Sequence, residues 1–381
     1  MQKASKPRSK KKAILLASLP IVGIVLIFAI AMMTVPSNLN LDAKAIPEAG
    51  SGLPSARDGA SAAWDGKNAY LFGGRSGSKY FDEILRFNAS TNMVTVMTAK
   101  LPSARTYTSV IWNGSYIFIF GGRVNKDFRD QVLRYDIATD TIKVMNATLP
   151  SGRDATSAVW NGRYAYIFGG LSGDNYLDQI VRYDPTADKA VLMNAKLPAG
   201  RYATSAVWDG TNAYIFGGRK DNTFFDDILR YDPTTDTITS MGASLPSGRD
   251  VTSAIWDGKN AFIFGGYDGR TALNDIVRYD PTAGKCQVMD LTLPTARYGT
   301  SSVWDGKNAY VFGGVDRKTS YGQALRCDVA AAVPAELFPL GMVVFALLVI
   351  ATIASCVGAY FLYKRLRKTK GTVNEPVQKK E

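Results

Sequence analysis

Short apolar runs separated by glycine and aspartate turns fill the middle of the chain and return every 48 residues. Leu-Pro marks this period, beginning at positions 53, 101, 149, 197, 245 and 293. Six Gly-Gly pairs keep the same interval. So do all six tryptophans: Trp64, Trp112, Trp160, Trp208, Trp256 and Trp304. Six copies without an insertion or deletion predict one structural unit repeated six times.

The repeat over residues 197–244 predicts four short strands, because apolar and β-branched residues gather in short runs between turn residues. The strands are expected over residues 204–208, 213–216, 228–231 and 237–241. An Asp-Gly hairpin signal follows the first strand, a double glycine closes the second, and an Asp-Pro turn follows the third. Four antiparallel strands per repeat are typical of one blade of a β-propeller.

The predicted fold is therefore all-β, a six-bladed propeller over residues 53–330 with four-stranded antiparallel blades. Small residues on the first strand suit the crowded centre of such a wheel, and one serine per repeat stands there in register: Ser61, Ser109, Ser157, Ser205, Ser253 and Ser301. The sixth repeat stops after its third strand, near Asp328. Residues 36–52 are expected to be a linker, of which 42–52 supply the missing outer strand.

Two apolar runs frame the repeats. Residues 13–35 form a run of 23, and a hydrocarbon core takes roughly 20 helical residues to cross. A cleaved signal peptide is the alternative, but its apolar region usually covers only about 7–15 residues, so we favour an uncleaved anchor. Residues 337–363 form the second run, after a linker at 331–336. A basic stop signal follows it, so we expect a second transmembrane helix, with a removed C-terminal sorting signal as the alternative.

The net charge of +12 is concentrated in the two tails. Residues 1–12 carry six basic residues and no acid, and residues 364–381 carry seven basic residues and two glutamates. The positive-inside rule places both tails in the cytoplasm, so the repeats are expected on the extracytoplasmic side of the cell membrane. The repeats themselves are almost neutral and carry no basic stripe, which argues against nucleic-acid binding.

Catalytic and metal chemistry find no support in the composition. There is no histidine, the commonest general base and metal ligand. The three cysteines, Cys286, Cys327 and Cys356, have no metal-site spacing. Cys286 and Cys327 lie in adjacent repeats, so a disulfide between them is one interpretation, and two small apolar residues are the one we favour. We expect no metal, no cofactor and no catalytic residue.

Four apolar residues before Gly-Gly, a Tyr-Asp-Pro turn and then Leu-Pro-x-x-Arg resemble the kelch repeat, most clearly as AYIFGG, YDP and LPAGR within residues 197–249. The resemblance covers residues 53–328. One departure is that the kelch tryptophan of the fourth strand is missing and a tryptophan ends the first strand instead. The resemblance implies a propeller scaffold. The histidine ligands of kelch-type copper oxidases and the Asp-box turns of sialidases are both missing from this sequence.

Two sets of arginines recur in every repeat, which favours a structural role over a ligand site. The first set follows Leu-Pro: Arg57, Arg105, Arg153, Arg201, Arg249 and Arg297. The second set precedes an aromatic or apolar residue of the third strand: Arg86, Arg134, Arg182, Arg230, Arg278 and Arg326. We expect hydrogen bonds and ion pairs between blades, with Asp82, Asp130, Asp178 and Asp226 as partners.

Binding residues are expected where the repeats differ. The loops after the second and fourth strands emerge on one face, and the loop after the second strand varies most, mixing arginine and lysine with tyrosine and phenylalanine. The expected binding residues are Arg75, Lys79, Tyr80, Tyr107, Arg123, Phe128, Arg129, Tyr176, Tyr202, Arg219, Phe224, Tyr267, Arg270, Tyr298 and Arg317. Unconstrained drift of loops is the alternative explanation of the same variability.

The sequence therefore favours a membrane-anchored propeller that binds an extracellular protein or glycan. Two alternatives stay open. One is a hydrolase or lyase acting on an extracellular polysaccharide, and the other is a structural protein of the cell envelope.

Overall fold

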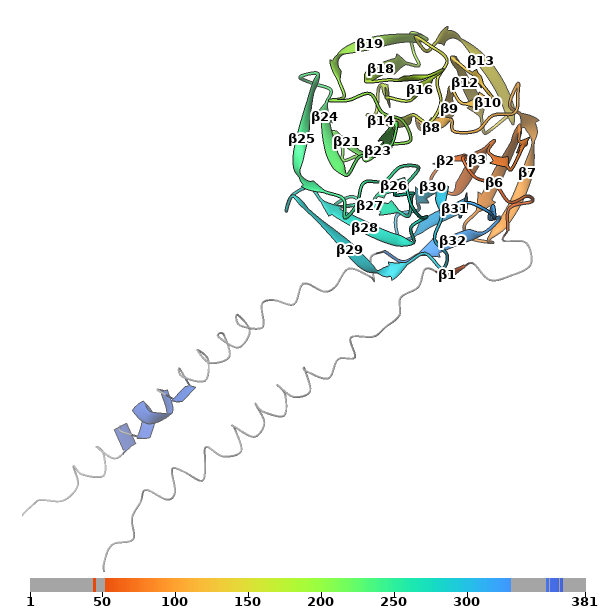
Figure 1. Cartoon of the computed structure of the whole chain (residues 1–381). Helices are drawn as coiled ribbons and strands as arrows, with labels where there is room; N and C mark the ends of the chain where they lie inside the picture. Colours follow the sequence, from red (N-terminus) through yellow and green to blue (C-terminus); the bar gives the residue numbers. More distant parts are fainter. Residues whose placement is uncertain (1–43, 46–51, 330–353, 356, 363, 366–381) are drawn as a thin grey trace, which may run out of the picture. The chain divides into compact units, whose positions relative to one another are not determined.

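The computed structural model describes residues 44–45, 52–329, 354–355, 357–362 and 364–365. Residues 52–329 form a ring of four-stranded antiparallel sheets around a central axis (Figure 1). With the short strand at residues 44–45 there are six such sheets, and we call them blades 1 to 6 in chain order. The predicted six-bladed, four-stranded architecture is confirmed.

Blades 1 to 5 run outward from the axis in chain order. Blade 1 contains β2 (Ser61–Trp64), β3 (Asn68–Phe72), β6 (Glu83–Asn88) and β7 (Met93–Lys100). Blade 2 contains β8 (Ser109–Trp112), β9 (Tyr116–Phe120), β12 (Gln131–Asp136) and β13 (Thr141–Thr148). Blade 3 contains β14 (Ser157–Trp160), β15 (Ala165–Phe168), β18 (Gln179–Asp184) and β19 (Lys189–Lys196).

Blades 4 and 5 continue the same order, and blade 6 takes its outermost strand from earlier in the chain. Blade 4 contains β20 (Ser205–Trp208), β21 (Ala213–Phe216), β24 (Asp227–Asp232) and β25 (Thr237–Ser244). Blade 5 contains β26 (Ser253–Trp256), β27 (Ala261–Phe264), β28 (Asp275–Asp280) and β29 (Lys285–Thr292). Blade 6 contains β30 (Tyr298–Trp304), β31 (Ala309–Val315), β32 (Ala324–Cys327) and β1 (Lys44–Ala45).

The innermost strands close the ring. Each of β2, β8, β14, β20, β26 and β30 contacts the next, and β30 contacts β2. Along these strands buried and half-buried residues alternate, as expected when successive side chains point to opposite faces of a sheet. The small serine positions predicted for the centre line the central channel.

The apolar core lies between neighbouring blades. Tyr135 of β12 packs against Tyr70 and Phe72 of blade 1, with ring centroids 5.8 and 5.7 Å apart. Tyr183 packs in the same way against Phe118 and Phe120 of blade 2. Each of these rings is at most 2% exposed, so neither blade could bury its aromatic face alone.

The arginines that follow Leu-Pro join one blade to the next. The backbone N–H of Arg105 donates to the carbonyl of Phe81 in blade 1. Its guanidinium donates to the carbonyl of Gly121 and to Gln131 Oε1 in blade 2, at 3.2 and 2.9 Å. All six arginines of this set are 0–1% exposed, and burial lowers the pKa of Arg105 to about 10. The predicted structural role agrees with these contacts.

The partners predicted for these arginines were wrong by one residue. Arg201 pairs with Asp227 rather than Asp226, at 2.5 Å, and the other arginines bind the equivalent side chains. Those partners are Glu83, Gln131, Gln179, Asp275 and Gln323. Of the four expected partners, Asp82 and Asp178 lie near Lys100 and Lys196 instead.

Blade 6 takes its fourth strand from the other end of the repeats. Lys44 pairs with Arg326, and Ala45 pairs with Leu325. This strand lies inside the segment 42–52, where the missing strand was expected. β32 runs in the same direction as β30, so its last residue, Cys327, lies at the end of the wheel where β30 ends in Trp304. β1 runs in the opposite direction to β32, so its first residue, Lys44, lies at that same end.

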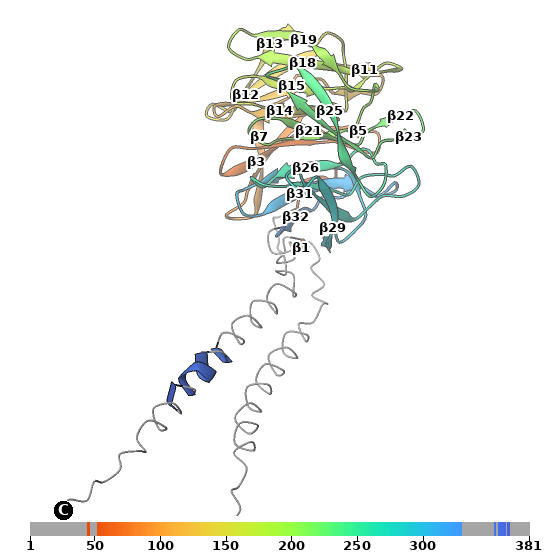
Figure 2. The same cartoon turned by 90° about the vertical axis from the view of Figure 1, so that its left-hand side faces the viewer.

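The two faces of the wheel differ. We call the end that carries the six tryptophans the tryptophan face; they surround a cavity of about 250 Å³. The opposite end carries the loops after the second and fourth strands, and we call it the loop face. Short hairpins project there (Figure 2): β4 (Arg75–Ser76) with β5 (Lys79–Tyr80), β10 (Arg123–Val124) with β11 (Asp127–Phe128), β16 (Leu171–Ser172) with β17 (Asn175–Tyr176), and β22 (Arg219–Lys220) with β23 (Thr223–Phe224).

The predicted tails and membrane segments fall mostly outside the described residues. This holds for residues 1–12 and 13–35, for the linker 331–336 and for most of 337–363. Residues 354–355, 357–362 and 364–365 are helical. In this described part of the chain we find no helix with both the length and the apolar character needed to cross a bilayer.

Cys286 and Cys327 are both free thiols, so the disulfide interpretation finds no support. Cys286 is half-buried beside the apolar cluster between blades 4 and 5, and Cys327 is buried. Burial raises the pKa of the Cys286 thiol to about 11 and that of Cys327 to about 12. The burial of both thiols agrees with the two small apolar residues that we favoured.

Candidate functional site

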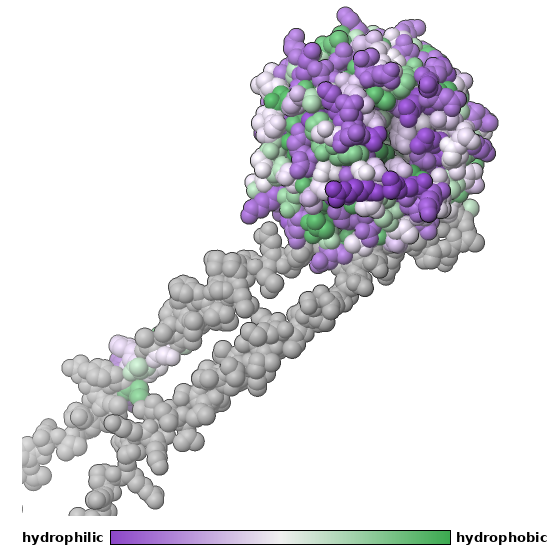
Figure 3. All heavy atoms as spheres, viewed as in Figure 1, coloured by the Kyte–Doolittle hydropathy of each residue, from purple (hydrophilic) through white to green (hydrophobic). Residues whose placement is uncertain are grey.

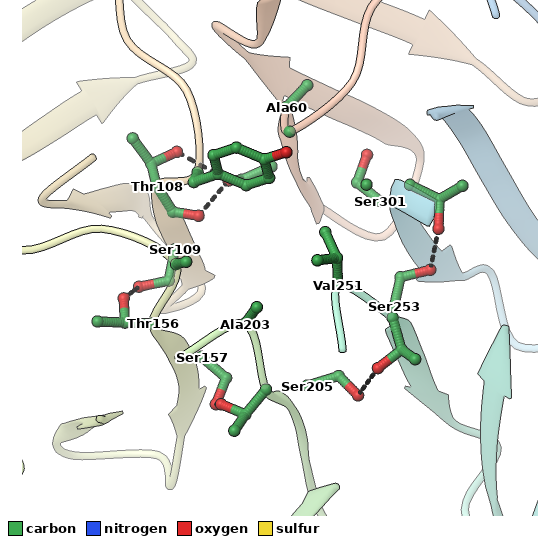
Figure 4. A pocket seen from close by; sticks show the side chains of 18 of the residues that line it. Ala60, Thr108, Ser109, Thr156, Ser157, Ala203, Ser205, Val251, Ser253 and Ser301 are labelled. Carbon is green, nitrogen blue, oxygen red and sulfur yellow. Dashed lines mark hydrogen bonds between the residues drawn. The ribbon is translucent and has the colours of Figure 1, made fainter. Parts of the chain in front are cut away.

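A belt of hydroxyl groups lines the central channel, which encloses about 170 Å³ (Figure 4). A serine of each blade meets a threonine of the next: Ser61 with Thr108, Ser109 with Thr156, Ser157 with Thr204, Ser205 with Thr252, and Ser253 with Thr300, at 2.7–2.9 Å. At the sixth junction Ala60 occupies the threonine position, and Ser301 Oγ has no hydrogen-bond partner. These hydroxyls mainly satisfy one another, so the channel itself offers few groups to a ligand.

A further cavity, of about 220 Å³, opens at the end of the channel on the loop face. We call it the mouth. Residues of all six repeats line it, including seven of the predicted binding residues: Arg75, Tyr107, Arg123, Tyr202, Arg219, Tyr267 and Tyr298. Hydrophilic residues predominate on the face that surrounds it (Figure 3).

Backbone pairing holds two loops together at the mouth. Arg75, Arg123 and Arg219 each begin a short hairpin. Each arginine forms a β-bridge with the residue after a buried Leu-Pro-x-x-Arg arginine: Asp58, Thr106 and Tyr202, respectively. The loop after the second strand is therefore fixed to the loop that enters its own blade, and both present side chains to the same cavity.

Three ion pairs surround the mouth. Arg75 Nε lies 3.1 Å from Asp58 Oδ2, and Arg123 Nε lies 2.8 Å from Asp154 Oδ2. Arg219 Nε lies 3.3 Å from Asp250 Oδ2. The three aspartate side chains are only 1–3% exposed, whereas the arginines are about 30% exposed. The three carboxylates stand in alternate repeats, one each at the entrance to blades 1, 3 and 5.

Two of these carboxylates have an oxygen without a partner. Asp154 Oδ1 and Asp250 Oδ1 are buried and accept no hydrogen bond, and both residues line the mouth. Burial raises the pKa of Asp154 to about 7, against the opposing effect of Arg123. Burial raises the pKa of Asp250 to about 7 in the same way, against Arg219. The residues that line the cavity therefore carry two buried acceptors, and two buried donors, Arg123 Nε and Arg219 Nε, that also lack a hydrogen-bond partner.

Tyrosine rings stand between the ion pairs. The Tyr107 hydroxyl donates to Asp58 Oδ2 at 3.1 Å, and its ring lies 5.4 Å from the Arg75 guanidinium. The ring centroids of Tyr267 and Tyr298 are 5.4 Å apart. The mouth thus combines aromatic faces with charged groups of both signs.

The other predicted residues lie outside the mouth. Phe224 packs on Tyr267, Tyr176 packs on Tyr202, and Phe128 lies under the Arg123 guanidinium, so these three support mouth residues. Arg317 donates to the Tyr267 hydroxyl at 2.9 Å, and Arg270 accepts from Arg317 through its carbonyl. The remaining three are hairpin residues: Arg129 pairs with Asp127, Lys79 lies over the Phe81 ring, and Tyr80 pairs with Arg75 across β4 and β5.

Sequence reasoning missed the three aspartates Asp58, Asp154 and Asp250. A signal was present, because the residue after the Leu-Pro-x-x-Arg arginine is aspartate in repeats one, three and five and threonine or tyrosine in the others. A position that alternates between chemically different residues is not required by the blade, which all six repeats share. The buried arginine just before this position is, by contrast, the same in all six repeats.

Six four-stranded blades around a channel, joined by Leu-Pro-x-x-Arg loops, define a kelch-type β-propeller. The chain belongs to the Attractin/LZTR1 beta-propeller family, whose family model matches residues 37–277 and 165–330. Kelch-type propellers commonly serve as protein-interaction modules. A comparison of the sequence with curated proteins found no match.

Proposed function

We propose that this chain is a recognition module anchored in the cell membrane, with its propeller on the extracytoplasmic side. It binds a protein or glycan through the loop face. The mouth is the observation that carries this proposal, because all six repeats contribute to it and its residues differ between repeats where the blade framework does not. Clusters of tyrosine and arginine are also enriched at the energetic centres of binding sites.

The polarity of the strands supports this display. The chain enters β1 and leaves β32 at the tryptophan face, opposite the mouth. Anchors attached at those two ends would leave the loop face free for a partner. The apolar runs 13–35 and 337–363, each next to a basic segment, are the source of the anchoring proposal.

Site-specific photocrosslinking tests recognition through the mouth. The full chain would carry p-benzoyl-phenylalanine in place of Tyr267 in the mouth, and a matched variant would carry it in place of Lys259, an exposed residue of a turn on the tryptophan face. On intact cells we expect adducts from position 267 and none from 259. Equal labelling from both positions, or labelling from 259 alone, would contradict recognition through the loop face.

Protease protection tests the orientation. With epitope tags at Met1 and Glu381, protease added to intact cells should cleave the propeller and spare both tags. A propeller protected together with its tags would contradict extracytoplasmic display.

An enzyme is the second candidate, and the raised pKa of Asp154 and Asp250 is the observation that favours it. Glycoside hydrolysis needs one carboxyl protonated and another ionised. The two aspartates have the same kind of partner and the same raised pKa of about 7, so their surroundings assign them no separate roles. Turnover of labelled polysaccharides that disappears in Asp154→Asn would establish the enzyme instead.

A further inference from the structure

Two buried carboxylate oxygens of residues that line the mouth lack a hydrogen-bond donor. Asp154 Oδ1 and Asp250 Oδ1 have no partner, although each residue is only 1% exposed. A buried acceptor left unsatisfied costs roughly 1–3 kcal/mol. Both atoms are closed to solvent in the empty mouth, so a ligand reaches them only when the carboxylate group turns toward the cavity. A ligand that then donates one hydrogen bond to each carboxylate recovers that cost, so the mouth favours ligands with at least two donors.

The charge of the mouth favours a neutral ligand. Each aspartate is already paired with an arginine, so above about pH 7, where Asp154 and Asp250 are ionised, three carboxylates and three guanidinium groups balance one another. The arginines would repel a cationic ligand, and the carboxylates would repel an anionic one. A hydroxyl group suits both, because it can donate to a carboxylate and accept from a guanidinium. Several hydroxyls on one small ring therefore match this alternation of charges.

The size and the walls of the mouth favour a single ring. Its volume of about 220 Å³ is below the roughly 300–1,000 Å³ of clefts that enclose drug-sized ligands. The rings of Tyr107, Tyr202 and Tyr298 give it flat apolar walls between the polar groups. A sugar ring has apolar C–H faces and hydroxyls at its edge, so the faces pack on tyrosine while the edge meets the ion pairs.

We propose that the mouth binds the terminal neutral monosaccharide of a glycan, whose hydroxyls donate to Asp154 Oδ1 and Asp250 Oδ1. The proposal rests on the recognition role of the loop face and names its ligand class. Only the end of the glycan enters, because the cavity has room for one ring. The rest of the glycan lies over the hairpins of the loop face.

A glycan array tests the proposal with the full-length chain in lipid nanodiscs. The array carries glycans with neutral ends (galactose, glucose, mannose, fucose and N-acetylglucosamine), glycans with sialic acid or sulfate at the end, and peptides that begin with lysine or arginine. We expect binding to at least one neutral end. We expect none to the charged ends or the peptides.

The variants Asp154→Asn and Asp250→Asn test whether these two carboxylates bind the sugar. The asparagine oxygen will face the arginine, so its amide group stands where Oδ1 stood and offers a donor in place of an acceptor. Each variant should lose about tenfold or more in apparent affinity, the equivalent of one good hydrogen bond. Asp174→Asn, on an exposed hairpin turn outside the mouth, is the matched control and should bind as the wild type does.

Tyr298→Ala removes one aromatic wall and keeps the charged residues of all three ion pairs, and it should also lose binding. Thermal melting of every variant shows that it is folded. Binding only to charged ends, or full binding by folded Asp154→Asn and Asp250→Asn, would overturn the proposal. If no glycan binds while position 267 still crosslinks a protein on cells, the sugar proposal fails and recognition through the loop face stands.

Discussion

At the scale of single residues, the junction between blades 6 and 1 differs from the other five. Serine and threonine hydroxyls meet at five junctions, but Ala60 leaves Ser301 Oγ buried without a partner. The backbone there repeats that of the other junctions, because the Gly59 N–H donates to the Gly299 carbonyl just as the Tyr107 N–H donates to the Gly59 carbonyl. The missing hydrogen bond therefore results from one substitution and not from a different backbone.

Ala60→Thr should stabilise the propeller by about 1 kcal/mol, because it supplies a partner to Ser301 Oγ. Chemical denaturation of the purified chain measures the effect as a shift in the midpoint. Ser157→Ala, which breaks an intact pair, should cost about the same amount. Ser301→Ala should be almost neutral in the wild type and costly in Ala60→Thr. Equal costs in both backgrounds would show that the pair does not form.

The buried carboxylate of Asp154 predicts a pH dependence. Its pKa is about 7 in the folded chain and about 4 in an unfolded one, so the folded state binds the proton more tightly. Its contribution to the free energy of unfolding is therefore largest below about pH 4 and is lost as the pH rises through about 7. From pH 8 to pH 5 the wild type should gain stability relative to Asp154→Asn. Urea denaturation at each pH measures the difference, and parallel profiles would contradict the assignment.

At the scale of elements, two glycines of blade 3, Gly162 and Gly169, distinguish the cost of backbone strain from the cost of steric overlap. Gly169 (φ +59°) follows β15, and an added Cβ would collide with the carbonyl oxygen of Arg201 in the next loop. Gly162 (φ +93°) lies in the β14–β15 turn with nothing near an added Cβ. Both conformations disfavour side chains, but only Gly169 sits at the contact between blades.

Gly162→Ala should cost about 1 kcal/mol from backbone strain alone. Gly169→Ala should cost clearly more, about 3 kcal/mol, because the loop that carries Arg201 must move as well. Thermal unfolding of the two variants provides the comparison. Equal losses would mean that the contact with Arg201 relaxes freely.

The strands were largely predictable because the repeat pattern averages over six copies. In blade 4 the expected second strand has the observed limits, 213–216, while the fourth continues to Ser244 instead of ending at Met241. The partner of Arg201 was missed by one residue. Since neighbouring strand residues point to opposite faces, that error exchanges Asp226 for Asp227.

The mouth was only half predictable. Variable loops identified its arginines and tyrosines, because those residues differ from copy to copy. Asp58, Asp154 and Asp250 follow directly after an invariant buried arginine, so they looked like part of the framework. Which side chains face the cavity depends on the β-bridge between two loops that are separated in sequence. Local patterns do not record such a contact.

At the scale of the whole molecule, one strand of two residues completes the ring. Each blade is covered by its neighbours, and blade 6 is completed only by β1. A chain that lacks residues 1–51 should lose about 1–2 kcal/mol of stability with the loss of this two-residue ladder. A chain that lacks residues 1–42 keeps β1 and is the matched control. Similar unfolding midpoints for the two truncations would mean that β1 contributes nothing to closure.

The position of the two chain ends has a mechanical consequence. Lys44 and Cys327 lie side by side at one end of blade 6, on strands that run in opposite directions. A pull that separates them loads the β1–β32 hydrogen bonds one after another, as in a zip, and not all together. Only two residue pairs resist it. Tension between the two ends would therefore open the wheel at blade 6 first, while the other five blades keep their strands.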